Sequence, residues 1–258
     1  MSAASAQAAR NRDRACVVAG LAGITAITWL YLIHLAREMG SPMEMGMPPM
    51  RAWGAVDVFL MFVMWVVMMA AMMVPSAAPM VLTFSGIARR HNERTHPFPA
   101  TGAFLAGYLA AWTGFSAAAI VVQWGLHRAA LLSPMMVSNN QVLGGTLLIA
   151  AGAFQFTPIK HACLSHCRSP IGFFLTEWRE GTLGAFHMGF RHGAYCVGCC
   201  WLLMALLFVA GVMNLLWVAA IAGYVLVEKV VPGGHLIGRT LGACVIAGGI
   251  WMVAGTLL

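Results

Sequence analysis

Charged residues are scarce in this sequence. Only 9% of its 258 residues are Asp, Glu, Lys or Arg, whereas 60% are hydrophobic. A soluble domain usually carries about a quarter charged residues, so this composition excludes an ordinary soluble globular protein. Apolar runs of about 20 residues, the length that crosses a bilayer core of about 30 Å, take up most of the chain. Because lipid offers the backbone no hydrogen-bond partners, we expect an all-α fold, a polytopic transmembrane helical bundle.

The short motifs of several common chemistries are also missing. The sequence contains no Gly-rich phosphate loop, no zinc-protease signature and no Ser-His-Asp order, and no ATP site is expected. No small-residue cleavage site follows the first apolar run, residues 15–36, which is also too long for the apolar part of a signal peptide. We therefore expect an uncleaved first helix, and binding rather than catalysis.

The apolar segments predict about seven spans, with six as the alternative. They lie near residues 15–36, 56–82, 101–123, 139–157, 193–212, 213–231 and 238–257. The sequence has 15 Lys and Arg residues. With these spans, 12 of them fall on one side of the membrane, and Arg37, Arg51 and Arg128 fall on the other. Because cytoplasmic loops carry the excess of positive charge, the N-terminus is expected in the cytoplasm. The net charge of +7 thus indicates membrane topology and a lipid bilayer as partner, not nucleic acid.

A single integral membrane domain is expected over residues 1–258. Its parts are an N-terminal helix with a Met-rich outer loop (14–55), a metal-binding core (56–231) and a last helix (238–257). The stretch 171–190, IGFFLTEWREGTLGAFHMGF, is expected to form a short amphipathic segment on the cytoplasmic face. Glu228 and Lys229, at the end of the sixth span, are expected to mark the interface with water.

The cysteines are grouped in one part of the chain. Five of the seven lie between residues 163 and 200, and none falls in an expected outer loop, so disulfides are not expected. On a helix, His192, Cys196, Cys199 and Cys200 form one stripe, and Cys163, His166 and Cys167 lie within a single turn. Two such half-sites together offer the thiolate and imidazole ligands that zinc, Cu(I) and iron–sulfur clusters favour. The alternative is that these cysteines are small hydrophobic residues that only fill buried positions.

Methionine is abundant in the first outer loop and the second span. The loop contains Met39, Met43, Met45, Met47 and Met50, and the span contains Met61, Met64, Met68, Met69, Met72, Met73 and Met80. On the helix this spacing is also typical of an ordinary packing seam, whereas the loop offers no core for thioethers to fill. Soft thioethers select Cu(I) over hard ions, so copper is the expected metal and zinc the second choice. Pro75 should kink the second span and free the carbonyl of Ala71.

Three motifs carry a resemblance to a known family. MWVVMMAAMMVPSAAPM, KHACLSHCRSP with WREGTLGA, and MGFRHGAYCVGCCWLLM with GVMNLLWV and LVEK are similar to a bacterial family of predicted metal-binding integral membrane proteins, a domain of unknown function, over residues 56–229. The resemblance implies an all-helical membrane protein whose Met and Cys/His motifs bind a metal, and implies neither the metal nor the reaction. The matching motif residues are Met64, Met68, Met72, Met73, Pro75, Cys163, His166, Cys167, His192, Cys196, Cys199 and Cys200.

The sequence leaves three functions open. The first is capture, transfer or transport of Cu(I), in which outer methionines take up the ion, methionines of the second span pass it inward, and a metal chaperone or membrane complex is the partner. The second is a membrane-embedded metalloenzyme or redox subunit, for which only His187 and His192 offer a general base near the cysteines. The third is a structural zinc or thiolate site that fastens the cytoplasmic loop 158–192 to the following span.

Overall fold

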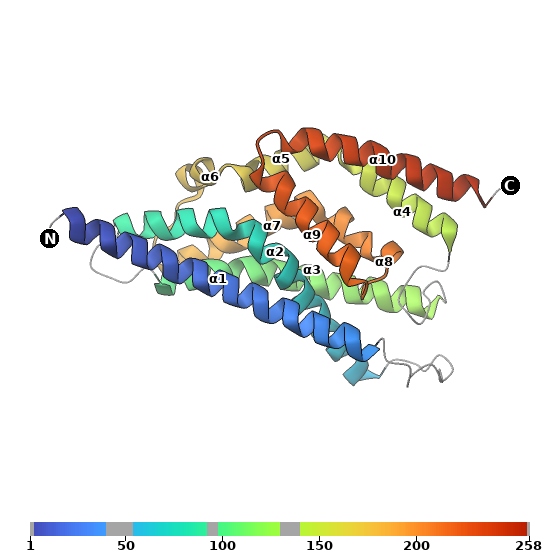
Figure 1. The fold of residues 1–258 in the computed structure, drawn as a ribbon, viewed down its shortest axis with the longest axis horizontal. Coiled ribbons are helices and arrows are strands. Elements are labelled where there is room, and N and C mark those ends of the chain that lie inside the picture. Colours follow the sequence, from blue (N-terminus) through green and yellow to red (C-terminus); the bar gives the residue numbers. More distant parts are fainter. Residues whose placement is uncertain (1–2, 40–53, 92–97, 130–139, 257–258) are drawn as a thin grey trace.

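The protein is a bundle of helices. The computed structural model describes residues 3–39, 54–91, 98–129 and 140–256, and no strand occurs in these ranges. The helices are α1 (Ala3–Met39), α2 (Ala55–His91), α3 (Phe98–Arg128), α4 (Gln141–Phe154), α5 (Pro158–Arg168), α6 (Pro170–Glu177), α7 (Gly181–Ala205), α8 (Leu207–Ala210), α9 (Leu215–Val230) and α10 (Gly234–Ala254). Helix α1 packs along α2, α7 along α3, and α10 along α4, with α9 between these pairs (Figure 1).

The predicted all-α fold with membrane-length helices is confirmed. In the described part of the chain, five helices are long and apolar enough to cross a membrane, or six if the bent pair of α4 and α5 counts as one span. The predicted segment 213–231 corresponds to α9, whose 16 residues fall short of the roughly 20 that a perpendicular span needs. The structure therefore agrees with the lower of the two expected numbers of spans.

Helix α2 bends in its middle, as Pro75 predicts (Figure 1). A proline has no N–H, so the carbonyl of Ala71, one turn earlier, loses its helical partner. That carbonyl accepts a hydrogen bond from the indole Nε1 of Trp29 on α1, at 3.2 Å. The bend is therefore compensated by the neighbouring helix, and α1 is fixed against α2 at this point.

Helix α7 begins earlier than the sequence analysis expected. The span was predicted to start at residue 193, but the helix starts at Gly181, and only α6 and a short link separate it from α5. Glycines explain why the longer helix fits: a Cβ at Gly189 would lie 1.9 Å from the carbonyl oxygen of Phe104, and one at Gly107 would lie 2.0 Å from that of Phe186. The backbones of α3 and α7 thus touch where the sequence was expected to lie on the membrane surface.

Within the predicted span 139–157, helix α4 ends at Phe154, and α5 begins at Pro158 and runs in another direction. Thr157 caps α5, its hydroxyl accepting from the N–H of Lys160, and Pro158 occupies the first helical position. The axes of α4 and α5 differ by 63°. This turn carries α5 back against α7, so the two cysteine-bearing helices become neighbours.

Candidate metal centre

The cysteines of α7 face the interior of the bundle. His192, Cys196, Cys199 and Cys200 are all buried, with at most 2% of their surface exposed. This is the stripe that the helical spacing predicted. It lies in the middle of α7 rather than at the start of a span, because the helix begins eleven residues before His192.

One cysteine of helix α5 lies next to this stripe. Cys167 on α5 is buried in the same cluster as Cys196 and Cys199 of α7 and lies close enough to interact with both. Cys199 and Cys200 both lie against Cys196, to whose backbone carbonyl their thiols are hydrogen-bonded. We call Cys167, Cys196, Cys199 and Cys200 the thiol cluster. Of the first predicted half-site, the structure therefore brings one residue, Cys167, against the cysteines of the second.

Cys163 and His166 lie at the edge of this cluster. Cys163 is half-buried, and its Sγ would be 2.9 Å from a Cβ at Gly198, so it packs on the outer side of α7. His166 is exposed, its Nδ1 is 2.8 Å from the carbonyl oxygen of Ala162, and its ring stacks on Tyr195 at 4.3 Å. The turn that was expected to point three ligands the same way directs only Cys167 fully inward.

The thiol cluster is a contact cluster rather than a closed coordination shell. Cys199 and Cys200 donate their S–H groups to the carbonyl oxygen of Cys196, at 3.1 Å and 2.7 Å. Among the described residues, no three His, Cys, Asp or Glu side chains surround a common point suited to a metal ion.

A buried ammonium group was missed by the sequence analysis. Lys229 was expected at the water interface, but only 8% of its surface is exposed. Its Nζ donates to Cys196 Sγ at 2.8 Å and to Ser76 Oγ at 3.2 Å. A sulfur that carries negative charge is a suitable partner for this ammonium group, because charge-assisted hydrogen bonds offset the free energy of burying a cation.

Glu228 is buried as well, and the expectation of a water interface is wrong for it too. Its carboxylate pairs with Lys160 Nζ at 2.6 Å and accepts from the hydroxyl of Tyr224 at 3.1 Å. Lys160 also donates to Gln155. Lys160 lies on α5, Gln155 directly follows α4, and Glu228 lies on α9, so no spacing along the sequence could have revealed the pairing of Lys160 with Glu228. It fastens α5 to α9 one residue away from Lys229.

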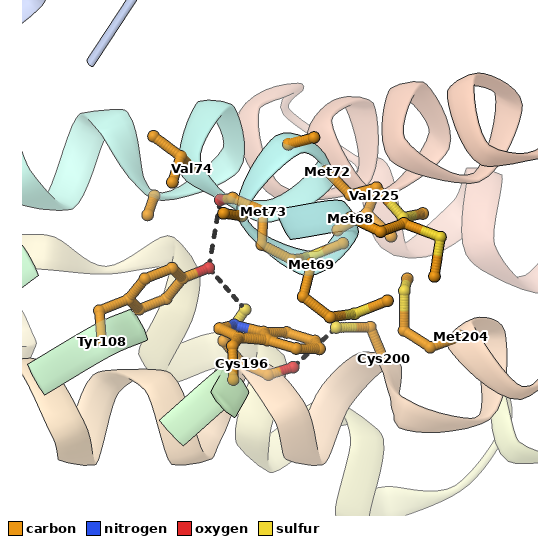
Figure 2. Packing of buried hydrophobic residues seen from close by; sticks show 14 of the residues in the cluster. Met68, Met69, Met72, Met73, Val74, Tyr108, Cys196, Cys200, Met204 and Val225 are labelled. Atoms are coloured by element: carbon orange, nitrogen blue, oxygen red, sulfur yellow. Dashed lines mark hydrogen bonds between the residues drawn. The ribbon is translucent and has the colours of Figure 1, made fainter. Parts of the chain in front are cut away.

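Two aromatic groups complete the surroundings of Cys196. The hydroxyl of Tyr108 donates to the carbonyl oxygen of Met73 at 3.2 Å and lies 3.1 Å from Cys196 Sγ (Figure 2). The ring of His192 stacks on Tyr108 at 5.5 Å, and its buried Nδ1 has no hydrogen-bond partner in the described part of the chain. A buried imidazole nitrogen without a partner is costly unless something binds it, so His192 fits a site that receives an ion.

The methionines of α2 belong to the core. Met64, Met68, Met72 and Met73 are each at most 3% exposed, which agrees with the packing interpretation. Figure 2 shows the side chains of Met68 and Met69 from α2 and of Cys200 and Met204 from α7 directed into the same interior space. The soft sulfur atoms of α2 therefore approach the thiol cluster. The outer-loop methionines Met43, Met45, Met47 and Met50 lie outside the described residues.

The fold and this centre define a class of protein: an all-helical bundle of membrane-length helices that encloses thiol, thioether and imidazole groups. Residues 62–252 match the model of the family PpoB2, described as a copper chaperone, and the chain belongs to this family. The match covers well over half of the chain and includes both cysteine-bearing helices. No curated protein and no solved structure shows significant similarity to the chain.

Proposed function

We propose that the protein carries Cu(I) on the thiol cluster and hands it to a partner. The observation that supports this most is the meeting of Cys167 from α5 with Cys196, Cys199 and Cys200 from α7 in a buried site. Thiolates select soft ions, and Cu(I) accepts low coordination numbers, so it does not need a closed shell of four ligands. Membership of a copper chaperone family supports copper as the cargo.

Transfer then proceeds by exchange of one sulfur ligand for another. Met68, Met69 and Met204 supply thioethers on the approach to Cys200 (Figure 2), and His192 Nδ1 is available as a further ligand. Each step replaces one soft donor with another, so no single step has to break a strong shell of ligands. Lys229 accompanies the Cys196 sulfur and compensates negative charge on it when the ion has left.

The surroundings of the carrier are part of the proposal. The long apolar helices lie in a bacterial inner membrane, with the N-terminus in the cytoplasm, because Lys and Arg residues are concentrated on that side. The outer-loop methionines capture the ion on the far side. Replacement of Met43, Met45 and Met47 by leucine should therefore reduce cellular copper uptake, whereas unchanged uptake and copper tolerance would contradict capture by this loop.

A structural zinc site is the second candidate, since α5 and α7 meet at the cysteines. Structural zinc would hold the thiols in a closed tetrahedral shell and would clamp α5 to α7. The fastening of α5 is also supplied without metal, by the ion pair of Lys160 and Glu228. The geometry thus favours an exchanging cargo over a permanent clamp.

Element-resolved metal analysis of the purified full chain tests the proposal. The wild type from copper-supplemented cells should carry copper, and a Cys196→Ser, Cys199→Ser, Cys200→Ser variant should lose it while still inserting into membranes. The matched control replaces the two exposed cysteines outside the cluster, Cys16→Ser and Cys244→Ser, and should keep copper. Zinc or iron in place of copper, or full copper retention by the triple variant, would overturn the proposal.

A further inference from the structure

A groove opens between α1 and the second half of α2. Its volume is about 730 Å³, and residues of α1, α2 and α9 line it. Asn11, Pro79 and Gly86 are exposed members of this lining, so the groove is accessible from outside the bundle. Binding sites for small molecules commonly have volumes between about 300 and 1,000 Å³. The groove therefore has the size of a ligand site.

One end of the groove is polar and positively charged. Asp13 of α1 and Arg89 of α2 form an ion pair there, and Arg10 and Arg14 line the groove within one turn of Asp13. Asp13 is the only acidic residue in the described part of the lining, and it offsets the charge of Arg89. The exposed guanidinium groups of Arg10 and Arg14 leave this end with a net positive charge. Such a charge attracts anions.

The other end of the groove is apolar. Its lining comes from α2 and α9 and consists of Pro75, Ala78, Pro79, Leu82 and Val230. These side chains offer no charge to a ligand, so an anion held at the arginines would leave this wall uncovered unless it also carried an apolar part. The groove thus has the two-part character of an amphipathic ligand.

The length and position of the groove match one leaflet of a bilayer. The apolar span of α1 begins at Arg10 and that of α2 ends at Arg90, so the polar end of the groove lies where both spans would reach the membrane surface. From Arg89 back to Pro75, α2 extends over about 21 Å at a rise of 1.5 Å per residue. Half of a bilayer, headgroups included, is about 20–22 Å thick. The apolar end therefore falls near the middle of the proposed membrane.

We propose that this groove binds an anionic phospholipid, with its phosphate at Arg10 and Arg14 and an acyl chain along the apolar wall. The inference goes beyond copper handling and rests only on the proposed membrane location. Basic pockets between membrane helices are typical sites for phospholipid headgroups. A free phosphate would not cover the apolar wall, and a zwitterionic headgroup would bring a further positive charge to the arginines. The two ends together select a lipid with net negative charge.

Native mass spectrometry of the full chain in detergent tests this, because it measures the fraction of protein that retains an added lipid. The probes are anionic phosphatidylglycerol and zwitterionic phosphatidylcholine with the same acyl chains. The test variant is Arg10→Gln with Arg14→Gln. The matched control is Arg12→Gln with Arg90→Gln, which removes the same charge through two exposed residues outside the described lining.

The wild type should bind phosphatidylglycerol at least about tenfold more tightly than phosphatidylcholine, because each arginine near the surface favours an anionic lipid. The test variant should lose this preference, and the control should keep it. Equal binding of both lipids by the wild type, or equal losses in the test and control variants, would overturn the proposal. Displacement of the lipid by inorganic phosphate would also overturn it, since the groove would then be a site for a free anion.

A second variant blocks the groove without removing charge. Gly86 lines it, and a Cβ at this position would have no described atom within 4 Å. Gly86→Leu should therefore fill part of the groove without disturbing the packing of α2, and leucine is the better helix former. Gly20→Leu is the matched control, because Gly20 is exposed, equally open and outside the described lining.

Gly86→Leu should weaken phosphatidylglycerol binding by about tenfold, because the side chain and the lipid compete for the same space. Gly20→Leu should bind the lipid like the wild type. Unchanged binding by Gly86→Leu would show that the lipid binds elsewhere. A protein dimer that this variant abolishes would assign the groove to a second copy of the chain and would likewise overturn the proposal.

Discussion

Cys163 and Cys167 lie one helical turn apart, yet their side chains have different surroundings. Cys167 is buried against the sulfur atoms of Cys196 and Cys199, whereas Cys163 is half-buried beside Gly198. The sequence pattern treats the two alike, because both lie on one face of a helix. Their difference arises from the packing of α5 against α7, which buries Cys167 and leaves Cys163 half-buried.

The two cysteines should therefore respond unequally to substitution. Cys167→Ser should lower Cu(I) affinity by at least about tenfold, since loss of even an outer-shell partner of a metal ligand commonly has an effect of that size. Cys163→Ser, the matched control, should change it much less. Competition with a Cu(I) chelator of known affinity measures both. An affinity that falls further for Cys163→Ser than for Cys167→Ser would contradict the assignment.

The buried ion pair of Lys160 and Glu228 makes a separate prediction about stability. Both side chains are at most 3% exposed, so removal of one leaves the other charge buried without its partner. Lys160→Met should therefore destabilise the protein by about 3 kcal/mol, and Lys160→Met with Glu228→Leu should recover part of this loss. Thermal unfolding in detergent, followed by circular dichroism, distinguishes the variants. A double variant less stable than the single one would show that the pair is not the cause.

At the scale of the helices, the bend of α2 is linked to the packing of α1 against it. The carbonyl of Ala71 has lost its helical donor to Pro75 and accepts from Trp29 instead. The sequence predicted the free carbonyl but not its partner, because Trp29 precedes it by 42 residues and lies on another helix. The bend also places Ser76 beside Lys229, so it shapes the approach to the thiol cluster.

This coupling can be measured with a double-mutant cycle. Trp29→Phe should reduce stability by about 1 kcal/mol, because the Ala71 carbonyl loses its partner. After Pro75→Ala, residue 75 regains an N–H that can donate to that carbonyl, so Trp29→Phe should then have a smaller effect. Trp217→Phe, at a half-exposed tryptophan, is the control. Equal effects of Trp29→Phe in both backgrounds would contradict the compensation.

At the scale of the whole molecule, apolar side chains cover much of the outside. Ile27, Leu216 and Ile250 have between 55% and 76% of their surface exposed. In a soluble protein such a surface would favour aggregation, whereas lipid accommodates it. The proposed membrane location would place these side chains in contact with lipid.

A charge on this surface should therefore be poorly tolerated. Ile27 is 69% exposed and close to the middle of the first span, Arg10–Glu38. Ile27→Arg should raise the free energy of insertion by about 3 kcal/mol and lower the amount of protein in the membrane fraction, whereas Ile27→Ala should not. Quantitative immunoblots of membrane fractions measure this. An exposed position in water would tolerate either change, so equal amounts of both variants would argue against lipid contact.

The sequence predicted those features that depend on local pattern: the helical class, the membrane-length helices, the bend at Pro75 and the inward stripe of His192, Cys196, Cys199 and Cys200. It did not predict the features that depend on contacts between segments far apart in the sequence. The turn between α4 and α5 depends on the Thr157 cap, and the early start of α7 depends on glycine contacts with α3. Lys229 seemed to mark the interface because burial of a lysine requires partners, and these lie on α2 and α7.

The central claim is that the thiol cluster binds Cu(I). X-ray absorption at the copper edge of the Cu(I)-loaded full chain tests it most directly, since it reports both oxidation state and ligand type. We predict Cu(I) in a shell dominated by sulfur, which the Cys196→Ser, Cys199→Ser, Cys200→Ser variant loses and the Cys16→Ser, Cys244→Ser control keeps. A shell of nitrogen and oxygen ligands, or a sulfur shell that is unchanged in the triple variant, would contradict the account.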